Sequence, residues 1–430
     1  MAQIQPFTAV VYRHEESPDI TPLVAPPYDV ITPEMRERLL ENEPHNVVAI
    51  DLPEGDPDPS APANRYANAE QLWHAWRKQG VLVYDNAPAM YVLEQTWEHE
   101  GRHVRRRALL AAVELHDFSD GVILPHEKTL PKTVMDRLYL TRACTANLSP
   151  VFGLFTDPAG ETDGIFDEAT LGNPMLVARD ADGVESRMWA LREPEAIESL
   201  ASMMADKQIF IADGHHRYEM ALAYRDERRA ADAEAGTAAA SRPYDYVLMA
   251  LVNMDDPDLV VMPTHRLVRA PGTFDTDAFW AALSERFDLV EQHLGTLAAL
   301  AAASRPCFVV KTADGTVRLA SLKREVDPAV AIPGEASAAW KNLDVSVLHE
   351  LVLRPLFQIS PDDAASLERL SFTNDAHQAF GLMGADVAFI MNPTRMDQLR
   401  SIALSGQTMP QKSTYFYPKL LTGMVFRPMD

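Results

Sequence analysis

The sequence predicts a mixed α+β protein. Short apolar runs that are typical of strands, such as Ile209–Ile211, alternate with segments in which apolar residues recur at helical spacing. Two segments have the pattern of antiparallel hairpins, one turning at Glu100-Gly101 and the other at Asp182-Gly183. We find no internal repeat, and the hairpins mean that no all-parallel sheet is required.

Length and composition indicate several globular parts. A chain of 430 residues is too long for one ordinary core, and 47% hydrophobic with 23% charged residues is typical of folded proteins. We expect an N-terminal α+β lobe over residues 1–115, a central core over 116–240 and a C-terminal α/β lobe over 241–430 that closes the site.

The net charge of −23, from 62 acidic and 39 basic side chains, argues against a DNA-binding protein, because DNA binding depends on neutralising phosphates. The basic run Arg102–Arg107 falls on the return strand of the first hairpin. We expect its arginines to face solvent or the acidic surface.

The chain has no run of 18 apolar residues and no signal-peptide core at its start, so we expect a cytoplasmic protein with no membrane partner. Its two cysteines, Cys144 and Cys307, cannot form a four-thiolate zinc site, and we expect both to be small buried apolar groups.

Local patterns predict where several helices begin and end. Thr32 with Pro33 is typical of a helix start, and Gly80 of a helix end. Thr394 and Asp397 have capping-box spacing, with Gly406 as the stop of that helix. Residues 225–242 are polar and rich in alanine, which predicts a helix tail that frays into a mobile loop.

The segment Asp213-Gly214-His215-His216-Arg217 lies between a predicted strand and a predicted helix. Free backbone N–H groups and the positive end of the helix dipole meet there, Gly214 permits close approach, and Arg217 offers a planar fork to phosphate oxygens. This favours a phosphate site. A capped turn with structural histidines, or metal ligation by Asp213 and the histidines, are the alternatives.

Two more polar clusters follow strand-like segments. Glu127, flanked by His126 and Lys128, could serve as a general base or belong to a surface salt-bridge cluster. The loop at 409–415 offers Lys412 to an anionic group. The phosphate loop GxxxxGK[ST], the dinucleotide fingerprint GxGxxG and the hydrolase elbow GxSxG are absent from the sequence.

Together the clusters resemble those of the free serine kinases, which have the ParB/sulfiredoxin-like fold. That family has a PHE motif with the catalytic glutamate, a DGHHR box, an NPT-type helix start after a strand, and an SPKTT-like loop. This chain has PHEKT (125–129), ADGHHRYE (212–219), ADVAFIMNPT (385–394) and MPQKSTYF (409–416) in the same order. It is also similar to a bacterial family of unknown function, through VAPPYDV (24–30), IADGHHRYE (211–219) and KSTYFYPKLLTG (412–423).

The resemblance implies a nucleotide-dependent phosphotransferase that acts on a small hydroxy amino acid, most simply free L-serine, with ATP or ADP and Mg²⁺. The alternative is a ParB-like nucleotide-binding regulatory protein without catalysis, and a third hypothesis is a metal-dependent hydrolase that uses the two histidines of the box. The implied roles fall into four groups: Glu127 and Asp213 are catalytic; Gly214, His215, His216 and Arg217 hold the nucleotide phosphate; Asp213 holds Mg²⁺; and His126, Lys412, Ser413 and Thr414 contact substrate or form a lid.

Overall fold

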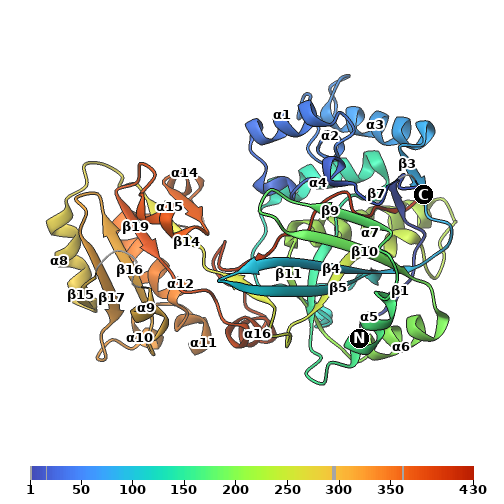
Figure 1. The fold of residues 1–430 in the computed structure, drawn as a ribbon. Coiled ribbons are helices and arrows are strands. Elements are labelled where there is room, and N and C mark those ends of the chain that lie inside the picture. The colour runs from blue at the N-terminus through green and yellow to red at the C-terminus, as the bar shows by residue number, and fades with distance from the viewer. Residues whose placement is uncertain (1, 16, 293–296, 361–362) are drawn as a thin grey trace. The chain divides into compact units, whose positions relative to one another are not determined.

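The computed structural model describes residues 2–15, 17–292, 297–360 and 363–430. It divides into two compact units (Figure 1). Unit 1 comprises Met1–Leu124, Thr129–Val260 and Pro418–Asp430, and unit 2 comprises Pro125–Lys128 and Val261–Tyr417. Both units combine sheets with helices, so the predicted mixed α/β fold is confirmed. No helix in the described ranges has the length and apolar character needed to cross a membrane.

Unit 1 is built on a nine-stranded mixed sheet with the order β6-β11-β8-β12-β5-β4-β10-β9, and β1 also pairs with β5. The pairs β6/β11 and β8/β12 are parallel and the other pairs are antiparallel. The strands are β1 (Ile4–Gln5), β4 (Met90–His99), β5 (Arg102–Glu114), β6 (Ile123–Leu124), β8 (Val151–Phe155), β9 (Leu176–Arg179), β10 (Glu185–Leu191), β11 (Ile209–Asp213) and β12 (Tyr246–Asn253). Two short pairs complete the unit, β2 (Val10–Tyr12) with β3 (Leu82–Tyr84) and β7 (Ala146–Asn147) with β21 (Arg427–Pro428).

Three helices of unit 1, α5, α6 and α7, pack against this sheet. Its main core lies among apolar residues of the central strands and of α5, α6 and α7, while α4 and α7 share a second, smaller apolar cluster. The helices are α1 (Pro33–Asn42), α2 (Val48–Asp51), α3 (Arg65–Gln79), α4 (Pro131–Cys144), α5 (Glu161–Ala169), α6 (Pro194–Met204) and α7 (His215–Glu234), with short 3-10 turns η1 (Thr21–Leu23), η2 (Tyr28–Val30), η3 (Phe118–Asp120) and η4 (Pro243–Asp245).

Both predicted hairpins are confirmed as β4/β5 and β9/β10. Glu100 and Gly101 have φ of 48° and 74°, which fits a tight turn that matches the strand twist. The predicted helix ends are confirmed too: the Thr32 side chain accepts from Met35 N, and Gly80 ends α3 with φ of 73°.

Two expectations for unit 1 differ from the structure. Arg107 pairs with surface acids as expected, but Arg106 is buried and only 1% exposed, because its guanidinium lies over the Phe152 ring and bonds to backbone and side-chain oxygens. Helix α7 continues as regular helix to Glu234, farther than expected, and residues 235–242 then form the expected non-helical segment.

The division of the chain into two compact units also differs from the three parts expected with boundaries at residues 115 and 240. Strands β4 and β5, from the expected N-terminal lobe, are central strands of the sheet that also contains β8, β11 and β12. Because residues 109–114 of β5 pair with residues 246–251 of β12, residues on either side of both expected boundaries share one sheet.

Unit 2 contains a six-stranded antiparallel sheet with the order β15-β17-β16-β19-β14-β18. Alternate residues of these strands belong to two apolar clusters, so helices cover both faces. The strands are β14 (His265–Val268), β15 (Phe287–Glu291), β16 (Cys307–Thr312), β17 (Val317–Leu322), β18 (Leu370–Thr373) and β19 (Val387–Ile390), and β13 (Val260–Met262) pairs with β20 (Tyr415–Tyr417). The helices are α8 (Thr276–Arg286), α9 (Ala298–Ala301), α10 (Pro328–Ala331), α11 (Ala338–Lys341), α12 (Asp344–Leu348), the π-helical turn η5 (His349–Leu353), α13 (Arg354–Phe357), α14 (Ala364–Leu367), α15 (Ala376–Phe380) and α16 (Met396–Leu404).

The predicted cap of α16 is wrong by one residue. The helix has Arg395 at its N-cap, and the backbone N–H of Arg395 donates to Gln398 Oε1. Thr394 is engaged elsewhere, because its hydroxyl donates to the carbonyl of Ser413 across 2.7 Å. Gly406 follows the helix end with φ of 68°, as expected of a stop.

Both cysteines are free thiols and buried, as expected. Burial raises the pKa of the Cys307 thiol to about 12 and also raises the pKa of Cys144. Neither is therefore a reactive thiolate near neutral pH.

Candidate functional site

The DGHHR segment forms the turn between β11 and α7 in unit 1. The register of β11 against β8 shifts between Ile211 and Asp213, and this bulge directly precedes the turn. Gly214 has φ of 87° and is the N-cap of the 20-residue helix α7. Gly214 has no side chain to cap the first N–H groups of α7, and the positive end of the helix dipole lies at this turn.

Arg217 folds back over this turn. Its guanidinium donates to Asp213 Oδ2 across 2.7 Å and also bonds to the carbonyl oxygen of Pro150. The positive φ favours glycine at position 214, and a Cβ atom there would lie 2.8 Å from Arg217 Nε, so a side chain would displace the guanidinium from this turn. The sequence prediction of a glycine turn next to a planar cation is thus matched by the geometry.

The two histidines have different environments. His215 is buried, whereas His216 is partly exposed. The backbone N–H of Leu130 donates to His216 Nε2 across 2.9 Å, which puts the ring proton of the neutral tautomer on Nδ1. The Thr129 hydroxyl donates to Glu219 on α7, so residues 129–130, which directly follow the PHEK segment, are bonded to the first turns of α7.

Lys419 also contacts the DGHHR turn, and the sequence analysis did not predict this contact. Its Nζ lies 2.8 Å from Asp213 Oδ1, so Asp213 forms ion pairs with both Lys419 and Arg217. The only hint in the sequence was that Lys419 falls within the KSTYFYPKLLTG signature, seven residues after Lys412.

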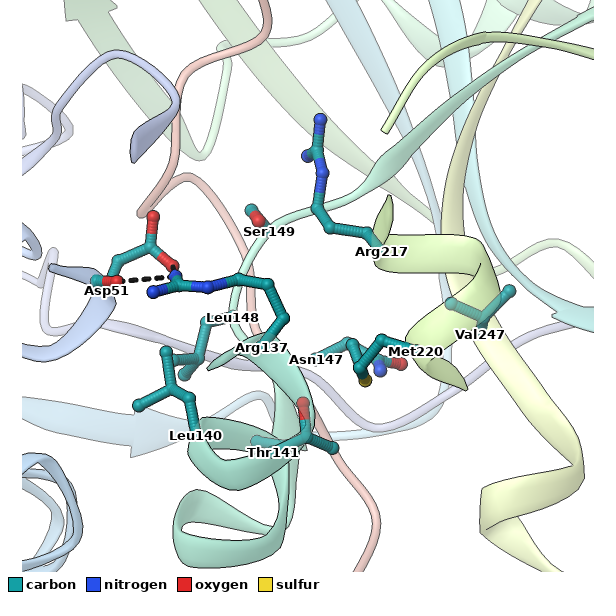
Figure 2. Close-up of a pocket in the computed structure, with 11 residues that line it drawn as sticks. Asp51, Arg137, Leu140, Thr141, Asn147, Leu148, Ser149, Arg217, Met220 and Val247 are labelled. Carbon is teal, nitrogen blue, oxygen red and sulfur yellow. Dashed lines mark hydrogen bonds and ion pairs between the residues drawn. The ribbon is translucent and has the colours of Figure 1, made fainter. Parts of the chain in front are cut away.

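A cavity of about 30 Å³ lies next to Arg217 in unit 1 (Figure 2). Asp51 and Arg137 face each other on one side of it, and Ser149 and Arg217 line another part of its wall. Arg137 donates to the Asp51 carbonyl across 2.7 Å, and its guanidinium lies 4.2 Å from the centre of the Tyr28 ring. Asp51 Oδ2 is buried and accepts no hydrogen bond, and burial raises the pKa of this carboxyl.

Tyr28 links the VAPPYDV segment to this region. Burial raises the pKa of its hydroxyl to about 12, while the positive charges of Arg137 and Arg217 act in the opposite direction. The N-terminal signature and the DGHHR turn therefore share one electrostatic environment within unit 1.

In unit 2, the PHE motif pairs with the C-terminal loop. Met409 N donates to the His126 carbonyl across 2.7 Å, and His126 Nε2 lies 2.9 Å from the Thr414 hydroxyl. The backbone N–H of Lys412 donates to Glu127 Oε1 across 3.1 Å. These bonds join two sequence clusters that are almost 300 residues apart in the chain.

The loop is anchored within unit 2 by buried side chains. Met409 at its start and Ser413 near its end are both buried. Lys412 has a φ of 56°, an uncommon backbone conformation for a residue with a side chain.

Arg266 supports this loop from β14. Its guanidinium donates to the Lys412 carbonyl across 2.9 Å and also bonds to the Thr264 carbonyl. Burial lowers the pKa of Arg266 to about 10, while the negative charge of Glu127 acts in the opposite direction. Arg266 therefore remains a cation at neutral pH, within electrostatic range of Glu127.

Two buried histidines lie in the field of Arg266. Burial, and then the charge of Arg266, lower the pKa of His265 to about 4 and that of His349 to about 3. His265 Nδ1 accepts a hydrogen bond from Met391 N across 3.1 Å, as only an unprotonated nitrogen can. Both histidines are therefore neutral under ordinary conditions.

The predicted site residues thus form two groups. Asp213, Gly214, His215, His216 and Arg217 are together in unit 1, and His126, Glu127, Lys412, Ser413 and Thr414 are together in unit 2. Among the residues that the structure describes, no group of three or more His, Cys, Asp or Glu side chains could hold a metal ion.

Comparison with protein families gives one match, over residues 4–346, to the family described as "Protein of unknown function (DUF1015)". The chain belongs to this family. The recognition of a bacterial family of unknown function from its sequence signatures is thereby confirmed. No match to this DUF1015 protein is found among curated proteins.

Several solved structures are similar to this DUF1015 protein. A free serine kinase in complex with AMP is 12% identical, with 72% of this chain and 86% of that chain covered and a TM-score of 0.32. A hypothetical protein from Pyrococcus furiosus is 12% identical, with 73% and 92% covered and a TM-score of 0.33. A C-terminally truncated SbnI from Staphylococcus aureus is 11% identical, with 74% and 87% covered and a TM-score of 0.34.

Proposed function

We propose that this protein transfers a phosphoryl group from ATP or ADP to the hydroxyl of a small amino acid, most simply free L-serine. The observation that carries the proposal is the turn before α7, where a positive-φ glycine, helix N–H groups and the Arg217 guanidinium lie together. Such an arrangement suits a phosphate group, which backbone donors and a planar cation bind without covalent chemistry.

In this proposal the phosphate-binding residues are those of the turn. Arg217 and the N–H groups after Gly214 hold the phosphoryl group, and the partly exposed His216 can donate from Nδ1. His215 is assigned to the same cluster, where its buried ring supports the turn.

Glu127 is the proposed general base. The serine hydroxyl oxygen forms a bond to the terminal phosphorus, the bond from that phosphorus to the nucleotide's bridging oxygen breaks, and the hydroxyl proton moves to the Glu127 carboxylate. The bond from Lys412 N to Glu127 Oε1 fixes the carboxylate, and the Arg266 charge stabilises its ionised, proton-accepting form. His126, Ser413 and Thr414 complete the proposed substrate contacts.

The expected role of Asp213 as a Mg²⁺ ligand fits its surroundings poorly. Both of its oxygens are engaged by cations, Oδ1 by Lys419 and Oδ2 by Arg217. Magnesium in phosphoryl-transfer sites is commonly held by one or two carboxylates together with the substrate phosphates. We therefore assign Asp213 to positioning the two cations and route no step through a metal.

The test is to incubate the full chain with Mg²⁺, ATP or ADP and a pool of amino acids, and to identify phosphorylated products by mass spectrometry. O-phosphoserine that forms with the wild type and is lost in Glu127→Gln would support the proposal. Nucleotide binding without any phosphorylated product would favour a regulatory nucleotide-binding protein and contradict a kinase.

A further inference from the structure

One carboxylate in unit 1 is shared by two cations. Asp213 lies 2.7 Å from a guanidinium nitrogen of Arg217 and 2.8 Å from Nζ of Lys419. All three side chains are largely buried, with exposed fractions of 22% for Asp213, 10% for Arg217 and 14% for Lys419. Both cations lie beside the N-terminus of α7, whose dipole has its positive end there.

Lys419 is held in this position by the sheet. The buried Arg106 guanidinium on β5 donates to the Pro418 carbonyl across 2.6 Å, and Gln95 on β4 donates to the Lys419 carbonyl across 3.3 Å. Burying a guanidinium costs free energy, and burial lowers the pKa of Arg106 to about 9, so its hydrogen bond to the loop carbonyl offsets part of that cost. The backbone at residues 418–419 is therefore anchored independently of its side chains.

The VAPPYDV segment anchors the other side of Lys419. Ala25 and Thr422 exchange both backbone hydrogen bonds, at 3.1 and 2.8 Å. Gly423 follows with φ of 104°, and a Cβ atom there would lie 3.3 Å from Val24 Cγ1. The signature at 24–30 thus contacts the part of the signature at 412–423 that lies in unit 1, residues 418–423, and fixes the chain on which Lys419 lies.

We propose that Lys419 is a second phosphate-binding cation of the α7 site, beside Arg217; this inference rests on the proposed function. Two cations held beside a helix N-terminus offer several donors to an anion, and a phosphate chain supplies several negative oxygens. The lysine ammonium has three donors on a flexible stem, so it can keep its contact with Asp213 while it donates to a phosphate oxygen. Asp213 positions both cations, and residues 24–30 hold the lysine-bearing segment in place.

The experiment measures binding of ADP, pyrophosphate and adenosine to the full chain by titration calorimetry. Lys419→Met should weaken ADP and pyrophosphate binding by roughly tenfold or more, the scale of one charge-assisted contact, and change adenosine binding by less than about twofold. Lys419→Arg should keep most of the affinity. The matched control is Lys78→Met, which removes an exposed lysine of α3 in the same unit.

A second measurement needs no variant. Acetylation of wild-type lysines, followed by mass spectrometry, should show that pyrophosphate and ADP protect Lys419 and leave Lys78 unchanged. This result keeps the inference testable if Lys419→Met fails to fold.

The outcomes separate the two proposals. If folded Lys419→Met binds ADP and pyrophosphate as the wild type does, or if neither ligand protects Lys419, the inference is wrong while nucleotide binding stands. If pyrophosphate binds in a Lys419-dependent manner but neither ADP nor ATP binds, the inference stands and the kinase proposal fails. A wild type that binds none of these anions would overturn both.

Discussion

The backbone amide of Lys412 donates to Glu127 Oε1 across 3.1 Å, which joins the PHE motif to the C-terminal loop within unit 2. Beside them, Arg266 bonds to the Lys412 carbonyl and lies within electrostatic range of Glu127. The proposed base is therefore held by a backbone donor and stabilised in its charged form by a buried cation.

Glu127→Gln should reduce turnover by about 100-fold or more, the usual size of a general-base contribution, and leave ADP and ATP affinity within about twofold. The amide keeps an oxygen that can accept from Lys412 N, so the loop should remain in place. Steady-state kinetics and calorimetry provide the measurements, with Glu285→Gln on the exposed face of α8 as the matched control. Unchanged turnover in Glu127→Gln would mean that another group removes the proton.

Arg217→Ala should weaken nucleotide binding by about 1.5–3 kcal/mol, and Arg217→Lys should restore only part of it because an ammonium cannot reproduce the fork. Asp213 keeps Lys419 as a partner in the alanine variant, so the turn should still fold. Calorimetry with ADP and ATP is the measurement, and Arg102→Ala on the exposed end of β5 is the control. If Arg217→Ala binds both nucleotides normally, the turn is structural.

The Lys412 substitutions separate the side chain from the backbone. Lys412→Gly should be at least as stable as the wild type, because glycine adopts the φ of 56° without the cost of about 1 kcal/mol that a side chain brings. Lys412→Ala keeps that strain. If the ammonium contacts the substrate, both variants should lose turnover while nucleotide affinity stays within about threefold.

Hydrogen exchange on residues 406–416 tests whether this loop acts as a lid. Its bonds to His126, Glu127 and Arg266 predict protection in the free protein, and nucleotide with serine should increase it beyond nucleotide alone. Equal exchange in all ligand states would show a fixed loop and leave Lys412 as a surface charge.

Acidification should destabilise the protein through His265. Burial and the nearby Arg266 lower its pKa from 6.5 to about 4, so the unfolded chain takes up this proton at a higher pH than the folded protein does. The stability contributed by neutral His265 is fully present above pH 6.5 and is lost as the pH falls towards 4. At pH 5 the loss in the free energy of unfolding is about 2 kcal/mol.

Urea unfolding of wild type and His265→Asn at pH 7 and pH 5 measures this loss. Asparagine keeps an acceptor near Met391 N. Between pH 7 and pH 5, the His265→Asn variant should therefore lose about 2 kcal/mol less free energy of unfolding than the wild type does. His377→Asn, an exposed histidine of α15, is the control. The same pH dependence in wild type and His265→Asn would show that carboxylates account for the whole effect.

Features that depend on chain neighbours could be predicted from the sequence. Glu100-Gly101 and Asp182-Gly183 specify hairpins, Thr32 and Gly80 mark helix ends, and Gly214 places the DGHHR segment at a helix start, since each conformation is set within a few residues. The one-residue error at Thr394 has a tertiary cause, because its hydroxyl bonds to a loop 19 residues away instead of capping its own helix.

Contacts between residues that are distant in the chain could not be predicted in this way. Lys419 and Asp213 are 206 residues apart, and Arg266 and Lys412 are 146 apart, so no local spacing relates them. Arg106 belongs to a basic run that suggested a surface cation. The run lies on β5, where successive side chains point to opposite faces of the sheet, and the pairing with β4 places Arg106 on a buried face. Strand register and the path of residues 418–430 through unit 1 follow from the packing of the whole unit. Neither can be predicted from the type of a single residue or from its neighbours in the chain.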